Sequence, residues 1–153
     1  MRKVLTNVFD CDIVKKKAQG GEMMAHEAYT RYIPGSRFAV VMIHGIVGTP
    51  DHFEDLLPVI PESWSVYNIL LDGHGGSVAD FASTSMEKWK AQVKATVAEV
   101  TGRHEKVVLV AHSMGTLFSV QAAIDNPEKI ARLFLLNVPV RMKLAPSMAI
   151  NSV

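Results

Sequence analysis

Cysteine is nearly absent from the 153-residue sequence, in which Cys11 stands alone. One cysteine cannot form an intramolecular disulfide, and it cannot supply the set of thiolates that a structural zinc site requires. Disulfides are typical of oxidising compartments. We therefore expect a reducing compartment and a cytoplasmic protein.

The sequence also lacks an excess of charge of either sign. Sixteen Lys and Arg residues stand against fifteen Asp and Glu residues, which gives a formal net charge of +1. The one run of basic residues, at 15–17, is short and has no interleaved aromatic residues, so we interpret it as solvated surface. A nucleic-acid partner needs a concentrated basic surface, and we expect no such partner.

Hydrophobic runs long enough to cross a bilayer are missing. The longest apolar stretches, FAVVMI at 38–43 and VVLVA at 107–111, fall far short of the roughly 20 residues of a membrane-spanning helix. Asn7, Asp10 and Asp12 interrupt what would have to be the apolar core of a signal peptide. The sequence therefore predicts no stable membrane span and no signal peptide.

What the sequence does contain is enough apolar residues for a packed core. The hydrophobic fraction is 48%, and the length suits a single domain over 1–153, in which 1–24 is only weakly patterned. Apolar segments without a polar face predict strands that are buried on both sides. They lie at 37–43, 65–71, 106–111 and 132–138, and an alternating segment at 25–33 predicts an earlier strand.

Helical patterns separate these strands. Thr49 and Pro50 are typical of a helix start, and Pro58 is expected to end or kink that helix. Thr84 and Glu87 have the spacing of a capping box before the next helix. Two apolar stripes predict longer helices: Met86, Trp89, Val93, Val97 and Val100, then Met114, Leu117, Val120 and Ile124. The alternation predicts an α/β fold, a doubly wound and mostly parallel sheet with helices on both faces.

The segment VVLVAHSMGTLFSV at 107–120 passes from a buried strand straight into a helix, with Ser113 at the corner. A serine hydroxyl is a poor nucleophile unless it is held close to a base and beside donors that receive an oxyanion. A sharp strand-to-helix turn exposes the hydroxyl, and it needs small residues two positions before and after the serine. Ala111 and Gly115 occupy these positions, and the N–H of Met114 is placed to receive negative charge. Ser113 is therefore a candidate nucleophile.

Three segments together resemble the α/β-hydrolase superfamily, in the esterase and lipase branch that includes acylglycerol-lipase and serine-aminopeptidase-like sequences. HGIVGTPDHF (44–53) is similar to the family's His-Gly loop, LLDGHGGS (70–77) to its Asp-x-Gly-His-Gly turn, and VAHSMGT (110–116) to its nucleophile elbow. The three occur in the family's order, and the resemblance covers about residues 25–140.

The resemblance implies a serine hydrolase scaffold with Ser113 as the nucleophile. The backbone N–H groups of Ile46 and Met114 would form its oxyanion hole. The supporting positions would be His44, Gly45, Ala111, His112 and Gly115. The resemblance further implies small or medium ester or acyl substrates, monoacylglycerols included, and no metal or organic cofactor.

Two features depart from the family's pattern. Ala111 stands where the family usually has glycine, which is a small intrusion. No histidine follows Ser113, and the only later acids, Asp125 and Glu128, flank Pro127, whereas the triad runs in the order Ser, acid, His. We therefore expect the triad acid and base to be missing from this chain. We interpret it as a C-terminally truncated hydrolase without the cap and the last strands, inactive by itself.

The remaining candidates have plainer interpretations. His44 and His74 are expected to fix their loops, His112 to pack with a hydrogen bond, and Asp72 to anchor its glycine-rich turn. A dyad of His74 with Ser113 is the less favoured alternative. Two further alternatives stay open: thioesterase or serine peptidase chemistry at the same serine, and a non-catalytic chain that pairs or self-associates through its open sheet edge.

Overall fold

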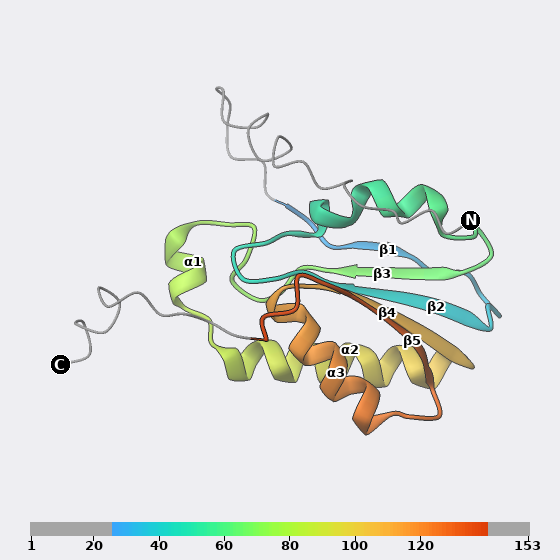
Figure 1. The fold of residues 1–153 in the computed structure, drawn as a ribbon. Helices are drawn as coiled ribbons and strands as arrows, with labels where there is room; N and C mark the ends of the chain where they lie inside the picture. Colours follow the sequence, from blue (N-terminus) through green and yellow to red (C-terminus); the bar gives the residue numbers. More distant parts are fainter. Residues whose placement is uncertain (1–25, 141–153) are drawn as a thin grey trace, which may run out of the picture.

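A computed structural model describes residues 26–140 as one sheet with helices against both faces (Figure 1). The strands are β1 (Tyr29–Arg31), β2 (Phe38–Ile43), β3 (Ser65–Ile69), β4 (Lys106–His112) and β5 (Ile130–Leu136). Their order across the sheet is β1-β3-β2-β4-β5. β2 pairs in parallel with β3 and β4, and β5 pairs in parallel with β4, while β1 runs antiparallel to β3. The predicted, mostly parallel α/β sheet is confirmed.

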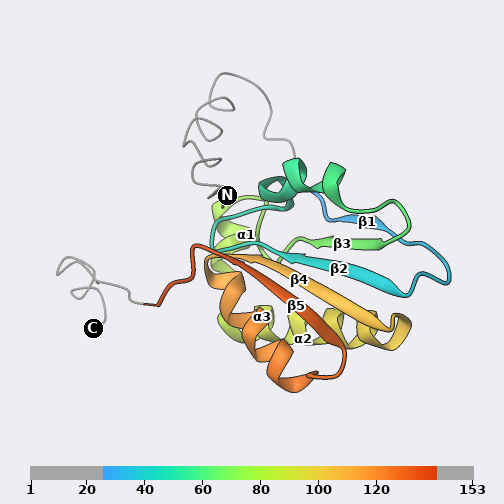
Figure 2. The same ribbon diagram turned by 45° about the vertical axis from the view of Figure 1, so that its right-hand side comes forward.

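The helices form a layer on each side of the sheet. The 3₁₀ helix η1 (Pro50–Val59) lies on one face, and α2 (Met86–Arg103) and α3 (Met114–Asp125) lie on the other. Figure 1 shows η1 as the green coil above the sheet, with α2 and α3 below it, and Figure 2 shows the same layers after a turn. The short helix α1 (Val78–Ala82) lies beyond one end of the sheet. Cover on both faces explains why the central strands have no polar side.

Two apolar clusters hold the layers together, and alternate residues of β2 belong to each. Val41 and Ile43 face the larger cluster, under α2 and α3. Val40 and Met42 face the smaller cluster, where Phe53 of η1 packs against them. Each aliphatic side chain of this size contributes roughly 1.5–3 kcal/mol when it is fully buried. β2 is therefore the central anchor of the fold.

Helix α2 follows its predicted stripe, but its N-cap differs from the prediction. The residues of the stripe that are buried are Trp89, Val93, Val97 and Val100. Ser85, not Thr84, is the N-cap, and its hydroxyl accepts a hydrogen bond from the N–H of Lys88. The hydroxyl of Thr84 instead donates to Oδ2 of Asp72 at 2.7 Å. A hydrogen bond to a loop residue outside the helix therefore displaced the predicted cap by one position.

Helix α3 occupies the predicted segment but buries a different face. Leu117, Val120 and Ile124 of the predicted stripe are 50%, 38% and 67% exposed. The buried face consists of Met114, Gly115, Thr116, Phe118, Ser119 and Ala122. Met114 is thus the one residue of the predicted stripe that is buried. Small residues on the buried face let the helix backbone approach the sheet closely, and the periodicity of large apolar residues did not indicate them.

The segment that follows β2 forms the predicted helix, although as a 3₁₀ helix. Thr49 is its N-cap, without a side-chain hydrogen bond, and Pro58 lies one residue before its end, as predicted. Helix α1 was not predicted. Ser77 and Asp80 form a capping box at its start, and this spacing in the sequence is the signal that could have indicated it.

Three expectations fall on parts of the chain outside the described residues: Cys11, the basic run at 15–17 and the weakly patterned segment 1–24. Within residues 26–140, no helix combines the length and the apolarity needed to cross a membrane.

Candidate active site

The loops that follow β2, β3 and β4 meet at one edge of the sheet, because the carboxyl ends of parallel strands point the same way. They comprise residues 44–49, 70–77 and 113. Open α/β sheets bind their ligands at this edge. The short helix α1 lies at the same end of the molecule (Figure 1).

Ser113 occupies a sharp corner between β4 and α3. Its backbone has φ 52° and ψ −122°, a conformation that costs a non-glycine residue on the order of 1–3 kcal/mol. The N–H of Ser113 donates to the carbonyl oxygen of Leu136 at 2.8 Å, and its carbonyl oxygen accepts from the N–H and the hydroxyl of Thr116. Hydrogen bonds to β5 on one side and to the first turn of α3 on the other thus hold the strained corner in place.

Glycines allow the corner to pack against the loop after β2. A Cβ atom at Gly45 would lie 2.7 Å from Cβ of Ser113, and one at Gly115 would overlap the carbonyl oxygen of Ile43. Ala111, in register with Ile43 on the neighbouring strand, is completely buried. Glycine at 45 and 115 is therefore sterically required, and the side chain of Ser113 starts directly beside Gly45.

Two backbone N–H groups near this corner are free of the local hydrogen bonds. Met114 is the first residue of α3, so its N–H has no carbonyl partner within the helix. Ile46 lies in a turn that is closed by the hydrogen bond from the N–H of Gly48 to the carbonyl oxygen of Gly45, and this bond does not use the N–H of Ile46. Val47 in the same turn has φ 56°, which is rare for a β-branched residue.

His44 links the loops after β2 and β3. It is completely buried, its Nδ1 donates to the carbonyl oxygen of Gly45 at 2.9 Å, and its Nε2 accepts from the N–H of Leu71 at 3.0 Å. Because Nε2 accepts, the proton must sit on Nδ1. Burial lowers the pKa of His44 to about 4, against the opposing effect of the Gly45 carbonyl. The neutral ring therefore connects the loops after β2 and β3 by hydrogen bonds, which is the loop-fixing role expected from the sequence.

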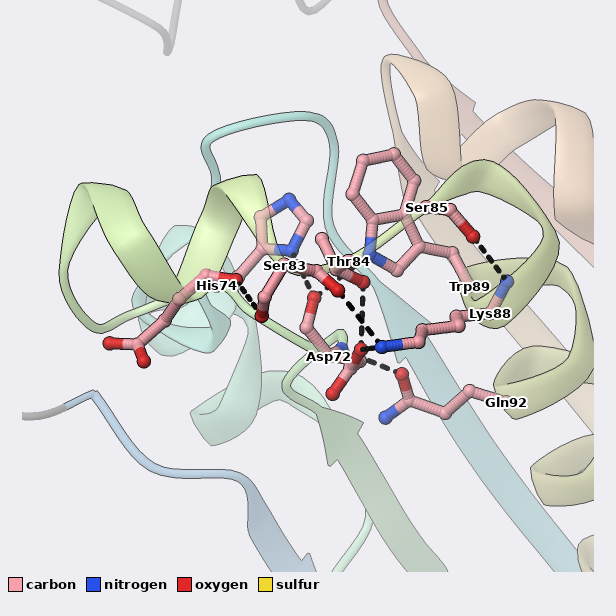
Figure 3. Close-up of polar contacts among 9 residues, drawn as sticks. Asp72, His74, Ser83, Thr84, Ser85, Lys88, Trp89 and Gln92 are labelled. Carbon is pink, nitrogen blue, oxygen red and sulfur yellow. Dashed lines mark hydrogen bonds and ion pairs between the residues drawn. The ribbon is translucent and has the colours of Figure 1, made fainter.

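Asp72 contacts helix α2 and the residue Thr84 that precedes it (Figure 3). This agrees with the prediction that Asp72 anchors its glycine-rich turn. Its Oδ2 accepts from the hydroxyl of Thr84 and lies 3.6 Å from Nζ of Lys88. Its N–H donates to the side-chain oxygen of Gln92, and its carbonyl oxygen accepts from Nε1 of Trp89. These contacts occupy both the backbone and the carboxylate of Asp72 in positioning the turn.

The ring of His112 contacts an amide group and another imidazole ring. Its Nε2 lies 3.0 Å from the amide nitrogen of Asn137, and its ring packs edge-on against His52 with centroids 5.5 Å apart. Burial, with a smaller contribution from His52, lowers the pKa of His112. The packed and hydrogen-bonded role predicted for His112 agrees with this geometry.

Among residues 26–140, no histidine or carboxylate makes a hydrogen bond to the side chain of Ser113. Asp125 ends α3 and Glu128 follows it, so both lie at the far end of the helix that Ser113 begins. The same part of the chain holds no group of three or more His, Cys, Asp or Glu residues placed to bind a metal ion. The described residues thus place Ser113 against Gly45 and next to the first N–H of α3, and none of their histidines or carboxylates makes a hydrogen bond to its side chain.

Comparisons with known proteins agree with this architecture. Residues 39–152 match the family model of the alpha/beta hydrolase fold. The chain is similar to the dihydrolipoyllysine-residue acetyltransferase component of the acetoin cleaving system of Cupriavidus necator, with 30% identity over 103 residues, 67% of this chain and 27% of that protein. It is also similar to the uncharacterized hydrolase YugF of Bacillus subtilis, with 26% identity over 109 residues, 71% of this chain and 39% of that protein. The chain spans less than half the length of either relative.

Solved structures extend the likeness to the three-dimensional fold. The structure described with LipS and LipT, two metagenome-derived lipolytic enzymes, has a TM-score of 0.71 and 28% identity, over 82% of this chain and 51% of that one. A thioesterase domain from the curacin biosynthetic pathway has a TM-score of 0.61 and 24% identity, over 80% of this chain and 45% of that one. The family model covers most of the sequence, and the sheet and its loop edge agree with it, so the chain belongs to the alpha/beta hydrolase fold family.

Proposed function

We propose that this sequence carries the nucleophile and the oxyanion hole of a serine ester hydrolase of the esterase and lipase type. The observation that carries the proposal is the corner at Ser113, with φ 52° and with its Cβ against Gly45. A conformation that costs free energy persists only where the surrounding structure holds it, and such residues cluster at functional sites.

In the proposed reaction, Oγ of Ser113 attacks the carbonyl carbon of an ester. A base takes the hydroxyl proton, and the carbonyl oxygen becomes an oxyanion that accepts hydrogen bonds from the N–H groups of Ile46 and Met114. Collapse breaks the bond to the alcohol, which leaves with a proton, and water then hydrolyses the acyl-enzyme. In known serine hydrolases, one donor of this kind is worth about 10²–10³ in kcat.

We assign the catalytic base and acid to residues outside these 153. Every histidine of the sequence lies at or before position 112, and those described have other partners or packing. Without base and acid, a site of this type keeps roughly 10³–10⁴ of acceleration over water from the oxyanion hole and binding. We therefore infer negligible turnover for the 153 residues alone, and esters of small or medium acyl chains as substrates of the whole enzyme.

Covalent labelling tests the role of Ser113. A fluorophosphonate probe is added to the longest protein that carries this sequence, and the modified peptide is identified by mass spectrometry. We expect the label on Ser113 and its complete loss in Ser113→Ala. Ser119→Ala is the matched control, because this buried serine lies in α3, the helix that follows Ser113, and its hydroxyl donates to the carbonyl oxygen of Gly115. Labelling that survives in Ser113→Ala removes Ser113 from the nucleophile role.

A second candidate, a chain that associates through its sheet edge, is favoured by the exposure of β5. Among residues 26–140 this strand pairs only with β4, and Phe134 on it is 57% exposed. An unpaired apolar edge strand is a template for pairing with another chain. Sedimentation of the chain with and without Phe134→Lys distinguishes a chain that self-associates from one that does not.

A further inference from the structure

The end of β5 contacts the Ser113 corner through two consecutive residues. The carbonyl oxygen of Leu136, the last residue of β5, accepts a hydrogen bond from the N–H of Ser113 at 2.8 Å. Asn137 follows directly, and its side-chain amide nitrogen lies 3.0 Å from Nε2 of His112. One hydrogen bond from this end of β5 therefore fixes the backbone of residue 113, and a second contacts the side chain of residue 112.

The backbone of Asn137 has the left-handed conformation, with φ 52°. Asparagine is one of the few residues other than glycine that adopt this conformation readily. It also carries a side-chain amide, which glycine lacks. Asparagine at this position therefore satisfies two requirements at once, the turn of the chain after β5 and the contact with His112.

The ring of His112 connects three segments around the corner. It packs edge-on against His52 of η1, with centroids 5.5 Å apart, and its Nε2 faces Asn137 after β5. It also lies against the loop after β2, because a Cβ atom at Gly45 would be 3.3 Å from its Nδ1. Among the described residues Nδ1 is buried without a hydrogen-bond partner. The amide of Asn137 thus supplies the one hydrogen bond that orients the ring within this part of the chain.

The contact also selects one form of the imidazole. An amide NH₂ group can only donate, so Nε2 of His112 accepts and the ring proton of the neutral form sits on Nδ1. The ring next to Ser113 is then held in one orientation and one tautomer.

We propose that Asn137 is a positioning residue for the nucleophile, which fixes the ring of His112 and through it the loop of Gly45 against the Ser113 corner. The inference rests on the proposed hydrolysis at Ser113. Asn137 acts through His112 and not on the reacting atoms. Small misplacements of a reacting group lower the rate of the chemical step, so loss of this hydrogen bond lowers kcat and leaves KM unchanged.

Kinetics of Asn137→Gly test this role, because glycine keeps the left-handed backbone and removes the amide. In the longest protein that carries this sequence, kcat for p-nitrophenyl butyrate should fall about three- to tenfold, as expected for one hydrogen bond. Asn126→Gly is the matched control. The amide of Asn126 donates to the carbonyl oxygen of Ala122 at the far end of α3, so this variant should keep the parent kcat and KM. An unchanged kcat in Asn137→Gly, or a change in KM instead of kcat, overturns the proposal.

A double-mutant cycle tests whether Asn137 acts through His112. His112→Phe keeps a ring of similar shape but has no nitrogen to accept the amide. In this background, Asn137→Gly should lower kcat no further, since coupled residues are not additive. If the two substitutions lower kcat independently, His112 does not transmit the effect of Asn137.

NMR of the histidine ring nitrogens tests the contact without catalysis. Aspartate also adopts the left-handed conformation, and in Asn137→Asp its carboxylate would accept a hydrogen bond from Nε2 of His112. We expect the ring proton to move to Nε2 and the pKa of His112 to rise above that of the parent. The titration also follows His52, the titratable group that faces this ring from η1. His104 is the internal control, because its ring nitrogens contact Tyr67 and the carbonyl oxygen of Ser36.

The outcomes separate the two proposals. Identical His112 titrations in the parent and Asn137→Asp overturn the contact itself. Turnover that depends on Ser113 but not on Asn137 overturns the positioning role alone. Turnover that survives in Ser113→Ala overturns the hydrolase proposal and the positioning role together, while the contact between Asn137 and His112 stands or fails by the titration.

Discussion

The loop edge of the sheet, formed by residues 44–49, 70–77 and 113, is built differently from the outer surface, formed by β5 and the exposed side of α3. At the loop edge, atoms from distant parts of the chain are in contact. Gly45 lies against Ser113, and the N–H of Leu71 donates to Nε2 of His44. There a single added methyl group would overlap existing atoms.

The outer surface has the opposite character. Leu117 and Ile124 of α3 and Phe134 of β5 are at least half exposed. In the part of the chain that the structure describes, β5 has a hydrogen-bonded strand neighbour, β4, on one side only. The comparison shows that apolar residues have two roles in this chain. Some pack tightly beneath the loop edge, and others form an exposed apolar surface suited to contact with further polypeptide.

The largest expected effect is at Gly115. In Gly115→Ala the new methyl group would overlap the carbonyl oxygen of Ile43 and lie 2.6 Å from that of His44. Because both partners are backbone atoms of the central strand and its loop, we expect a loss of about 3 kcal/mol or more in the free energy of unfolding. Urea unfolding followed by circular dichroism measures it.

Gly102→Ala is the matched control for this substitution. Gly102 lies within α2, and an added Cβ there would meet nothing within 4 Å. Alanine in place of glycine inside a helix stabilises by roughly 0.5–1 kcal/mol. If both alanine variants changed stability by similar amounts, close approach at Gly115 would not be the reason that glycine is required there.

The sequence predicted the loop edge well, because its signals are local and chemically specific. Apolar runs indicated the strands, and small residues around Ser113 indicated the corner. The family resemblance, carried by short motifs, pointed to the correct fold. The role of His44 in fixing its loop was also predicted, because a polar ring that follows a buried strand needs hydrogen-bond partners on a neighbouring loop.

The outer surface and the caps were predicted less well, for physical reasons. Met114 of the predicted α3 stripe is buried, but the rest of the stripe is exposed. Packing against the sheet selects small residues such as Ser119 and Ala122, which periodicity of large apolar residues does not weigh. The cap at Thr84 was wrong because Asp72 competes for its hydroxyl. The packing of His74 against rings from three separate segments was not predicted either, because no local pattern contains that information.

A second prediction concerns the pH dependence that the loop edge confers. Burial lowers the pKa of His44 from 6.5 to about 4. Between these pH values the unfolded chain binds a proton that the folded chain does not, so the free energy of unfolding falls as the pH drops from 6.5 to 4. A shift of this size corresponds to about 3 kcal/mol. His112, whose pKa is also lowered, adds a loss of the same sign.

Urea unfolding at a series of pH values between 7 and 4 measures this loss, with His44→Gln as the comparison. Glutamine does not titrate, so the variant should be less stable at pH 7 but should lose about 3 kcal/mol less on acidification. Parallel pH profiles for the parent chain and His44→Gln would show that His44 is not the group that makes the loop edge sensitive to acid.

The smallest expected effect on stability is at Phe134, on the outer surface. The side chain is 57% exposed, so Phe134→Lys should change the free energy of unfolding by less than about 1 kcal/mol. Phe118→Ala is the contrast, because Phe118 is 6% exposed and truncation of a buried phenylalanine costs about 3–5 kcal/mol.

If β5 mediates association, Phe134→Lys should also reduce the rise of the sedimentation coefficient with protein concentration, since a lysine on an edge strand opposes pairing. A large loss of stability in Phe134→Lys would place this residue in a core, and an unchanged sedimentation profile would remove β5 as the contact surface. Either result would weaken the distinction between the tightly packed loop edge and an outer surface that is available for contact with another chain.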